Sequence, residues 1–410
     1  MIKKNHLTLC TFVFLAGIIA VSARQATAAT LTVDDDHVQC PHAGFSTIQS
    51  AVNAASPNDR INVCPGTYAE QVKVTKPLTI QGIEVANQHL SLIMPTAVVA
   101  NSTSTATGFP IAAIVLVEGT DRVTLTHLAV DGANNALGDC ATNLVGIYYR
   151  NASGTINDVA VRNIELAPAL FGCQVGFGIL VQSGGGGRSR VEILDSSIHD
   201  YQKNGIVASE AGTEVFVSRN AVSGVGATPL IAQNGIQISF GAKGIVENNS
   251  VINHIYSQCT AVNNCSFVST NILIFQSDGV RVFGNTTGNA QVNIFYSGDR
   301  GEVHFNTIQQ SPVFDGVALI GNNNRAFGNS VKNSGSEGFY VQGNRNDVIA
   351  NIINEAPMGI FEDTPSSNNH FSPNDFDNTG LNVVSAGSAA SVLQSVTNIV
   401  SLRNPSVARP

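Results

Sequence analysis

A repeat of about 22 residues within positions 315–363 constrains the fold of this chain more than any other feature. Asn329 and Asn351 lie 22 residues apart, each ahead of a short β-branched stretch. Glycines that open short apolar strands keep nearly the same period, with intervals of 22 and 21 residues, at Gly316, Gly338 and Gly359. Two features in separate strands that share one period are typical of stacked structural repeats.

The same pattern continues upstream with longer and less regular spacing. The second position of each opening strand is glycine or asparagine, at Gly146, Gly178, Gly205, Gly235, Asn271, Asn293, Gly316, Gly338 and Gly359. A second series follows at Asn163, Ser196, Asn220, Asn249, Asn285, Asn306, Asn329 and Asn351. Both series lengthen and shorten together, so insertions lie between the asparagine of one coil and the opening strand of the next.

We therefore predict an all-β fold, a right-handed parallel β-helix of about ten coils spaced about 4.8 Å apart. The isoleucines after the opening positions, such as Ile147 and Ile179, should point inward, and the asparagines should form a hydrogen-bonded ladder. A left-handed hexapeptide helix needs a strict six-residue period, which is absent, and the leucine skeleton of leucine-rich repeats is absent too.

The N-terminal sequence predicts a cap on this solenoid. Ser46 and Gln49 form a capping-box pattern ahead of a short amphipathic helix that should end near Pro57. An open solenoid end needs such a cap, because an uncapped first coil exposes its core and strand edges. We expect a signal peptide over 1–28, the capped β-helix over 29–380, and a C-terminal tail or second cap over 381–410.

The predicted signal peptide has the usual three parts. Lys3 and Lys4 precede an apolar run over 7–21, and Ala26-Thr27-Ala28 is a small-x-small cleavage pattern. The run is shorter than the ~20 residues of a spanning helix, which favours a cleaved signal peptide over the alternative of a retained N-terminal anchor. We expect no membrane span in the mature protein and a secreted or periplasmic location.

Cysteine usage agrees with export. Six cysteines remain after Cys10 leaves with the signal peptide, at Cys40, Cys64, Cys140, Cys173, Cys259 and Cys265. An even number in an exported chain predicts disulfides. We expect the pairs 40–64, 140–173 and 259–265, because each pair falls on neighbouring coils or within one loop. None has CxxC spacing, so a zinc site is not predicted.

The charge balance restricts the partners. Removing Lys3, Lys4 and Arg24 from 21 basic residues leaves 18 against 29 acidic ones, a net charge of −11. An acidic surface argues against nucleic acid and against anionic membranes. An acidic polysaccharide would need a local basic site. We expect a monomer.

The segment FSTIQSAVNAASPNDRINVCPGTYAEQVKV resembles the N-terminal segment of exported β-helix proteins of the pectin-lyase-like superfamily, and most closely that of pectin methylesterases. The later Gly-Ile and Asn-x-Ile coils resemble the generic repeats of the superfamily. The resemblance implies the fold and a cleft between the first sheet and its loops. The methylesterase blocks QALR, DFIFG and LGRPW are missing, as are the signatures of pectate lyases, polygalacturonases and alginate epimerases, so no catalytic residue is carried over.

The outward face of the opening strands is the predicted substrate-binding surface. Its amide, aromatic and basic side chains suit a glycan chain lying along the axis, and they are Tyr148, Arg150, Gln182, Gln237, Phe275 and Tyr340. The alternative is a half-solvated sheet covered by loops. The absence of tryptophan weakens the case for sugar binding.

The predicted catalytic residues lie on the longer loops. One loop carries His199, Asp200 and Lys203, and another carries His254 and Tyr256. Histidine, lysine and tyrosine can abstract a proton beside a carboxylate or pass one to a leaving oxygen. The alternative is that these are ordinary polar loop residues.

Two further groups of polar residues have a pattern that can bind a ligand or an ion. Acids and arginines alternate along one edge, at Asp278, Arg300, Asn323 and Arg345, either as a poised basic site or as an exposed ion-pair ladder. Asp34-Asp35-Asp36 suggests calcium, but calcium needs ligands from several directions, which favours a solvated acidic loop. No cofactor is evident from the sequence.

The leading hypothesis is an exported β-helix protein that binds or acts on an extracellular polysaccharide, with uronic-acid lyase chemistry if it is an enzyme. The competing hypothesis is a non-catalytic surface or periplasmic binding protein.

Overall fold

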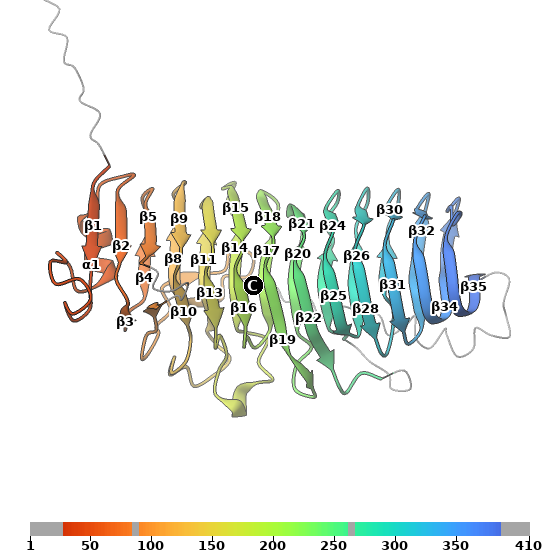
Figure 1. Cartoon of the computed structure of the whole chain (residues 1–410), viewed down its shortest axis with the longest axis horizontal. Helices are drawn as coiled ribbons and strands as arrows, with labels where there is room; N and C mark the ends of the chain where they lie inside the picture. Colours follow the sequence, from red (N-terminus) through yellow and green to blue (C-terminus); the bar gives the residue numbers. More distant parts are fainter. Residues whose placement is uncertain (1–27, 84–89, 261–266, 387–410) are drawn as a thin grey trace, which may run out of the picture.

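The chain is an elongated right-handed parallel β-helix, as predicted (Figure 1). The computed structural model describes residues 28–83, 90–260 and 267–386. Residues 1–27 of the predicted signal peptide and residues 387–410 of the predicted tail lie outside the described residues. No helix in the described part is long and apolar enough to cross a membrane.

Each coil contributes strands to three columns. The first column is a twelve-stranded parallel sheet, which comprises β1 (Thr30–Val33), β2 (Arg60–Val63), β5 (Thr79–Gly82), β9 (Val123–Thr126), β12 (Gly154–Asn157), β15 (Ser189–Leu194), β18 (Thr213–Ser218), β21 (Lys243–Glu247), β24 (Arg281–Phe283), β27 (Glu302–His304), β30 (Arg325–Phe327) and β33 (Asp347–Ile349).

The other two columns belong to one continuous sheet. The opening-strand column comprises β4 (Val72–Val74), β8 (Pro110–Glu118), β11 (Asn143–Arg150), β14 (Phe177–Gln182), β17 (Asn204–Ser209), β20 (Asn234–Ser239), β23 (Thr270–Phe275), β26 (Val292–Ser297), β29 (Val317–Ile320) and β32 (Glu337–Asn344). The return column comprises β3 (Gly66–Tyr68), β6 (Ser91–Ile93), β10 (Ala129–Asp131), β13 (Ala160–Arg162), β16 (Ser197–His199), β19 (Ala221–Thr228), β22 (Ser250–Tyr256), β25 (Thr286–Ala290), β28 (Thr307–Ser311) and β31 (Ser330–Ser334).

The two columns merge at the C-terminal end of the described chain. There β34 (Ile352–Ser367) pairs with both β31 and β32, and β35 (Asp375–Ser385) pairs with β34. The solenoid strands therefore continue past residue 380. Two small elements lie outside the columns: β7 (Ser102–Thr103), antiparallel to β8, and a 3-10 helix over Pro168–Leu170.

The strand register explains the glycine and isoleucine periods. Ile147, Ile179 and Ile206 lie opposite one another in successive opening strands and are fully buried. The glycine before each isoleucine meets the backbone of the next coil: a Cβ on Gly178 would lie 2.6 Å from the carbonyl oxygen of Gly205. The close approach of the stacked coils therefore leaves no room for a Cβ at Gly178, whereas Asn271 and Asn293 occupy the equivalent position in two later coils.

The predicted asparagine ladder is present at the turn between the twelve-stranded sheet and the return column. In each step the side-chain oxygen of one residue accepts the backbone N–H of its predecessor, at 2.9–3.0 Å. The members are Ser196, Asn220, Asn249, Asn285, Asn306, Asn329, Asn351 and Asn374. The prediction that Asn163 belongs to this ladder is wrong. Its side-chain amide donates to Asp131 instead. The backbone N–H that donates to the Ser196 hydroxyl in this coil is that of Val159.

The N-terminal cap is present with a different capping residue. The helix α1 spans Ile48–Ala54, and its N-cap is Thr47, not Ser46. The carboxylate of Glu70 accepts the N–H groups of Ile48 and Gln49, at 2.7 and 2.9 Å. A carboxylate from the first coil thus satisfies helix donors that the sequence assigned to a local capping box.

Two of the three predicted disulfides are confirmed, Cys40–Cys64 and Cys140–Cys173. Cys259 is also disulfide-bonded. Its predicted partner, Cys265, lies outside the described residues.

Candidate functional site

The predicted catalytic residues have separate environments in the structure. His199 and Asp200 follow each other at the end of β16, with Nδ1 of the histidine 2.6 Å from a carboxylate oxygen of the aspartate, and both are partly exposed. The hydroxyl of Tyr256 donates to Gln258 at 3.1 Å. The proposed catalytic role of these residues stays a prediction.

Lys203 and His254 are fully buried. The Lys203 ammonium donates to the carbonyl oxygen of Ala232 at 2.5 Å, and burial lowers the pKa of Lys203 to about 7. His254 hydrogen-bonds to the Tyr201 hydroxyl and to the side-chain oxygen of Asn271, and burial lowers its pKa to about 4. A polymeric glycan cannot reach side chains at these depths without movement of the coil, so this geometry favours a structural role.

A small hollow near His199 and Asp200 contains a carboxyl group that the sequence did not single out. It has a volume of about 300 Å³ and is lined by Asn134, Asn163 and Glu165, among others. Burial raises the pKa of Glu165, and the charge of Asp200 raises it further. The raised pKa of Glu165 results from its burial, which the sequence does not show, so the sequence could not distinguish this residue from other acidic loop residues.

The predicted substrate-binding residues face outward as expected, but they do not form an open surface. Tyr148, Gln182, Gln237 and Tyr340 are buried, and the ends of the first two lie beneath the segment around β7. Tyr340 donates to Asp363 at 2.6 Å. Arg150 and Phe275 are only partly exposed: Arg150 pairs with Glu118 at 2.9 Å, and Phe275 contacts Phe240 edge to face. The alternative of a covered sheet describes this face better.

The alternating acid and arginine edge forms a ladder of bonds between coils. Arg300 pairs with Asp278 at 2.9 Å, and Arg345 donates to Asn323 at 2.9 Å. Such exposed contacts contribute little to stability each.

The Asp34-Asp35-Asp36 carboxylates lie within 4.8 Å of one another. A carboxylate oxygen of the buried Asp34 accepts the N–H of Cys40, and one of Asp35 accepts the N–H of Thr67. These bonds give the two residues a structural role in the N-terminal loop.

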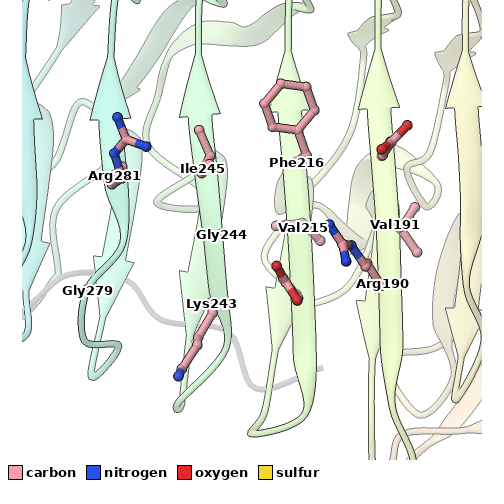
Figure 2. A pocket seen from close by; sticks show the side chains of 11 residues that line it. Arg190, Val191, Val215, Phe216, Lys243, Gly244, Ile245, Gly279 and Arg281 are labelled. Carbon is pink, nitrogen blue, oxygen red and sulfur yellow. The ribbon is translucent and has the colours of Figure 1, made fainter.

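An open groove with a different composition runs across the outer face of the twelve-stranded sheet (Figure 2). It has a volume of about 520 Å³ and crosses β15, β18, β21 and β24. Because neighbouring strands pair in register, Arg190 lies opposite Glu214, and Glu214 lies opposite Lys243. We call this surface the basic groove, defined by Arg190, Glu192, Glu214, Phe216, Lys243 and Arg281.

One row further along the strands, a second line of groove residues surrounds an aromatic ring. Glu192 lies opposite Phe216, and Ile245 lies opposite Arg281. A smaller hollow adjoins the groove at the turn edge and adds Arg188. Together the two hollows contain four cations and two carboxylates in a protein whose net charge is −8.

Most of these cations are unpaired. Within residues 28–83, 90–260 and 267–386, the side chains of Arg188, Arg190 and Lys243 form no ion pair and no hydrogen bond, whereas Arg281 pairs with Glu302 at 3.1 Å. Exposed cations that lack an internal partner can bind an anionic ligand without first breaking a salt bridge. Phe216 provides an apolar surface between them.

Comparison with known proteins identifies no sequence relative and supports the fold. No family model and no curated protein sequence matches this chain. Selenomethionine and native structures of the GH136 lacto-N-biosidase from Eubacterium ramulus have TM-scores of 0.58 and 0.57. Both are 12% identical and cover 87% and 85% of this chain, and 67% and 68% of their own. A Yersinia enterocolitica family 28 exopolygalacturonase has a TM-score of 0.48 at 11% identity, covering 88% of this chain and 78% of its own.

The likeness to the lacto-N-biosidase confirms the right-handed parallel β-helix that the resemblance to the pectin-lyase-like superfamily implied. At 12% identity it shows the fold alone.

Proposed function

We propose that this protein is exported and binds an acidic extracellular polysaccharide along the basic groove. The observation that carries the proposal is a set of three cations on the surface of an acidic protein, Arg188, Arg190 and Lys243, which have no ion-pair partner in the part of the chain that the structure describes. Carboxylate or sulfate groups of a glycan would lie against these cations, and the apolar face of a sugar ring would lie against Phe216. The groove is open and crosses four coils, which suits a polymer better than a small molecule.

The disulfides and the predicted signal peptide support an extracellular or periplasmic location, since disulfides persist in oxidising compartments. In such a compartment the available acidic polymers include uronic-acid and sulfated polysaccharides. The net negative charge of the protein disfavours non-specific capture of polyanions, so binding would depend on the local cations.

The test is retention on acidic and neutral glycans by the wild type and by two charge variants. Arg190→Gln/Lys243→Gln should weaken binding to polygalacturonate, alginate or a sulfated glycan about tenfold, and wild-type binding should weaken with added salt. Arg122→Gln/Lys332→Gln removes the same charge from exposed positions outside the groove and should leave binding unchanged. Equal losses in both variants would indicate a non-specific charge effect, and no retention of the wild type on any acidic glycan would overturn the proposal.

Catalysis on the same polysaccharide is the second candidate. The groove places Lys243 with Glu192 and Glu214, and basic and acidic groups around one ligand are what general acid–base chemistry requires. The hollow beside His199, Asp200 and Glu165 is a separate place where such chemistry could occur. Lysis of a uronic-acid polymer yields an unsaturated product that absorbs in the ultraviolet. The retention samples can therefore be assayed directly, and binding without this product would favour the non-catalytic protein over the lyase.

A further inference from the structure

A stack of three aromatic rings lies on the outer face of the twelve-stranded sheet, beside the basic groove. Phe283, His304 and Phe327 occupy equivalent positions on β24, β27 and β30. The centroid of the His304 ring lies 4.9 Å from that of Phe283 and 4.7 Å from that of Phe327, with interplanar angles of 21° and 14°. The three rings form one continuous stack along the axis of the solenoid.

Two arginines lie against the phenylalanines of this stack. The guanidinium carbon of Arg281 is 5.2 Å from the centre of the Phe283 ring, and that of Arg325 is 4.5 Å from the centre of the Phe327 ring. These distances are within the range of cation–π contacts. In the described part of the chain Arg325 has no ion pair and no side-chain hydrogen bond, so its charge remains available.

Phe305 projects from the adjoining turn and is 60% exposed. Its ring makes edge contacts with His304 and Phe327, with centroid distances of 5.3 Å in both cases. Phe305 and Arg325 therefore contact the same ring, that of Phe327. They present an aromatic surface and a cation side by side.

Phe305 occupies the left-handed turn position that precedes the asparagine ladder in each coil. Its φ is +55°, in the left-handed region that favours glycine, and the equivalent residues of the two neighbouring coils are Gly284 and Gly328, each at +65°. A bulky side chain in this conformation is strained. A ring that is mostly in water contributes little to stability. Neither the left-handed backbone conformation nor burial of the side chain therefore explains why this residue is phenylalanine. The left-handed conformation itself belongs to the turn, since Asp195, Arg219, Asn248 and Ala350 adopt it at the same place in other coils.

The neighbouring coil leaves room for the exposed ring. A Cβ on Gly328 would lie 2.5 Å from Cε1 and 2.6 Å from Cδ1 of Phe305, so only glycine leaves room for the ring on this turn. The edge contacts with His304 and Phe327 restrict the ring on one side, and a ring with fewer free rotamers loses less conformational entropy when it binds a ligand.

Arg281 connects this surface to the proposed binding site, because it lines the basic groove and also lies over Phe283. A ligand that follows the groove from β15 to β24 along the solenoid axis would next reach β27 and β30. The step between coils is about 4.8 Å, close to the length of one sugar unit.

We infer that Phe305 is the stacking platform for one sugar ring of the acidic polysaccharide and that Arg325 contacts the anionic group of that ring. This inference rests on the proposed function and extends its site from four coils to six. The shared chemistry of the ligand is a pyranose ring that carries a carboxylate or a sulfate.

The test compares the affinities of three variants for oligogalacturonate and for a sulfated oligosaccharide of equal length. Phe305→Asn should bind about fivefold more weakly than the wild type, since asparagine removes the ring. Its melting temperature should be no lower, because asparagine tolerates the left-handed conformation. Phe305→Trp should bind at least as tightly as the wild type. The control is Phe109→Asn, which removes another phenylalanine that is 60% exposed, and it should leave the affinity unchanged.

Each outcome decides a different point. Unchanged affinity in Phe305→Asn, together with weak binding by Arg190→Gln/Lys243→Gln, would overturn the platform and leave the basic groove standing. A lower melting temperature in Phe305→Asn would assign the ring to stability and overturn the inference. Failure of the wild type to bind either oligosaccharide would overturn both the platform and the groove. The oligosaccharide that is bound more tightly identifies the anionic group.

Discussion

The side-chain oxygen of Asn329 accepts two hydrogen bonds from Asn306, one from its backbone N–H at 3.0 Å and one from its side-chain amide at 2.9 Å. Asn306 repeats the arrangement with Asn285 below it and also donates to the carbonyl oxygen of Val282. Each buried amide is thus both donor and acceptor for adjacent coils, and the ladder satisfies backbone groups that would otherwise lie unpaired in the turn.

Asn306→Ala should therefore lower the free energy of unfolding by about 3 kcal/mol, because it removes the acceptor of the buried Asn285 backbone N–H and the donor to the carbonyl oxygen of Val282. Urea denaturation followed by circular dichroism measures the change. Gln309→Ala removes an amide from an exposed strand position three residues away and should stay within about 0.5 kcal/mol of the wild type. Equal unfolding free energies of the two variants would show that the hydrogen bonds of the ladder do not stabilise the fold.

Gly338→Ala should also destabilise the solenoid. The added Cβ would lie 2.5 Å from Cγ2 of Ile353 and 2.7 Å from the carbonyl oxygen of Gly359, so the coils must separate locally. Overpacking of this kind costs about 1–3 kcal/mol. Gly138→Ala is the matched control, since a Cβ there meets no atom within 4 Å. Thermal melts of the two proteins should differ clearly, and a Gly338→Ala protein as stable as the control would contradict the close stacking.

Stability should fall as the pH drops from about 6.5 to about 4. Burial lowers the pKa of His254 to about 4, from an ordinary value of 6.5, although its hydrogen bond with Asn271 partly opposes the shift. The unfolded chain thus binds a proton within this window and the folded chain does not. The stability from neutral His254 is complete above pH 6.5 and is lost as the pH falls towards 4, with a maximum contribution of about 3 kcal/mol.

Replacing His254 by glutamine checks the source of this pH dependence. His254→Gln should be less stable than the wild type at pH 7, because it disturbs the bonds to Tyr201 and Asn271. Its unfolding free energy should nevertheless change less between pH 7 and pH 4.5. The measurement is a series of urea titrations over that range. Parallel curves for the two proteins would mean that another group titrates on unfolding.

The sequence predicted the scaffold because its constraints are local and repeat in every coil. Contact with the adjacent coil selects glycine before Ile179 and asparagine at position 306. These residue types therefore recur in the sequence with the period of the coils. Asn163 was the exception: it has the right residue type at about the right spacing, but it bonds Asp131 outside the ladder.

The surface could not be read in the same way. Whether an outward residue is exposed depends on segments distant in the chain: Gln182 is covered by Ser104 and Thr105, 78 and 77 residues away. The basic groove was missed for a related reason. Arg190, Glu214 and Lys243 each lie six residues before a ladder residue, Ser196, Asn220 and Asn249, so the asparagine series does align them. Which of them lack an ion-pair partner depends on side-chain positions that this alignment does not give.

The same register makes one prediction in which a substitution should strengthen binding. Glu214 lies between Arg190 and Lys243 on adjacent strands, and its negative charge opposes an anionic glycan in the basic groove. Glu214→Gln keeps the size of the side chain and removes that charge, so the affinity for an acidic polysaccharide should rise about threefold at low ionic strength and less in high salt. Isothermal titration against oligogalacturonate measures the gain. Glu355→Gln, at an exposed position on β34, makes the same change in net charge and should leave the affinity unaltered. Weaker binding by Glu214→Gln would instead mean that the carboxylate itself contacts the ligand, as a hydrogen-bond acceptor from sugar hydroxyls.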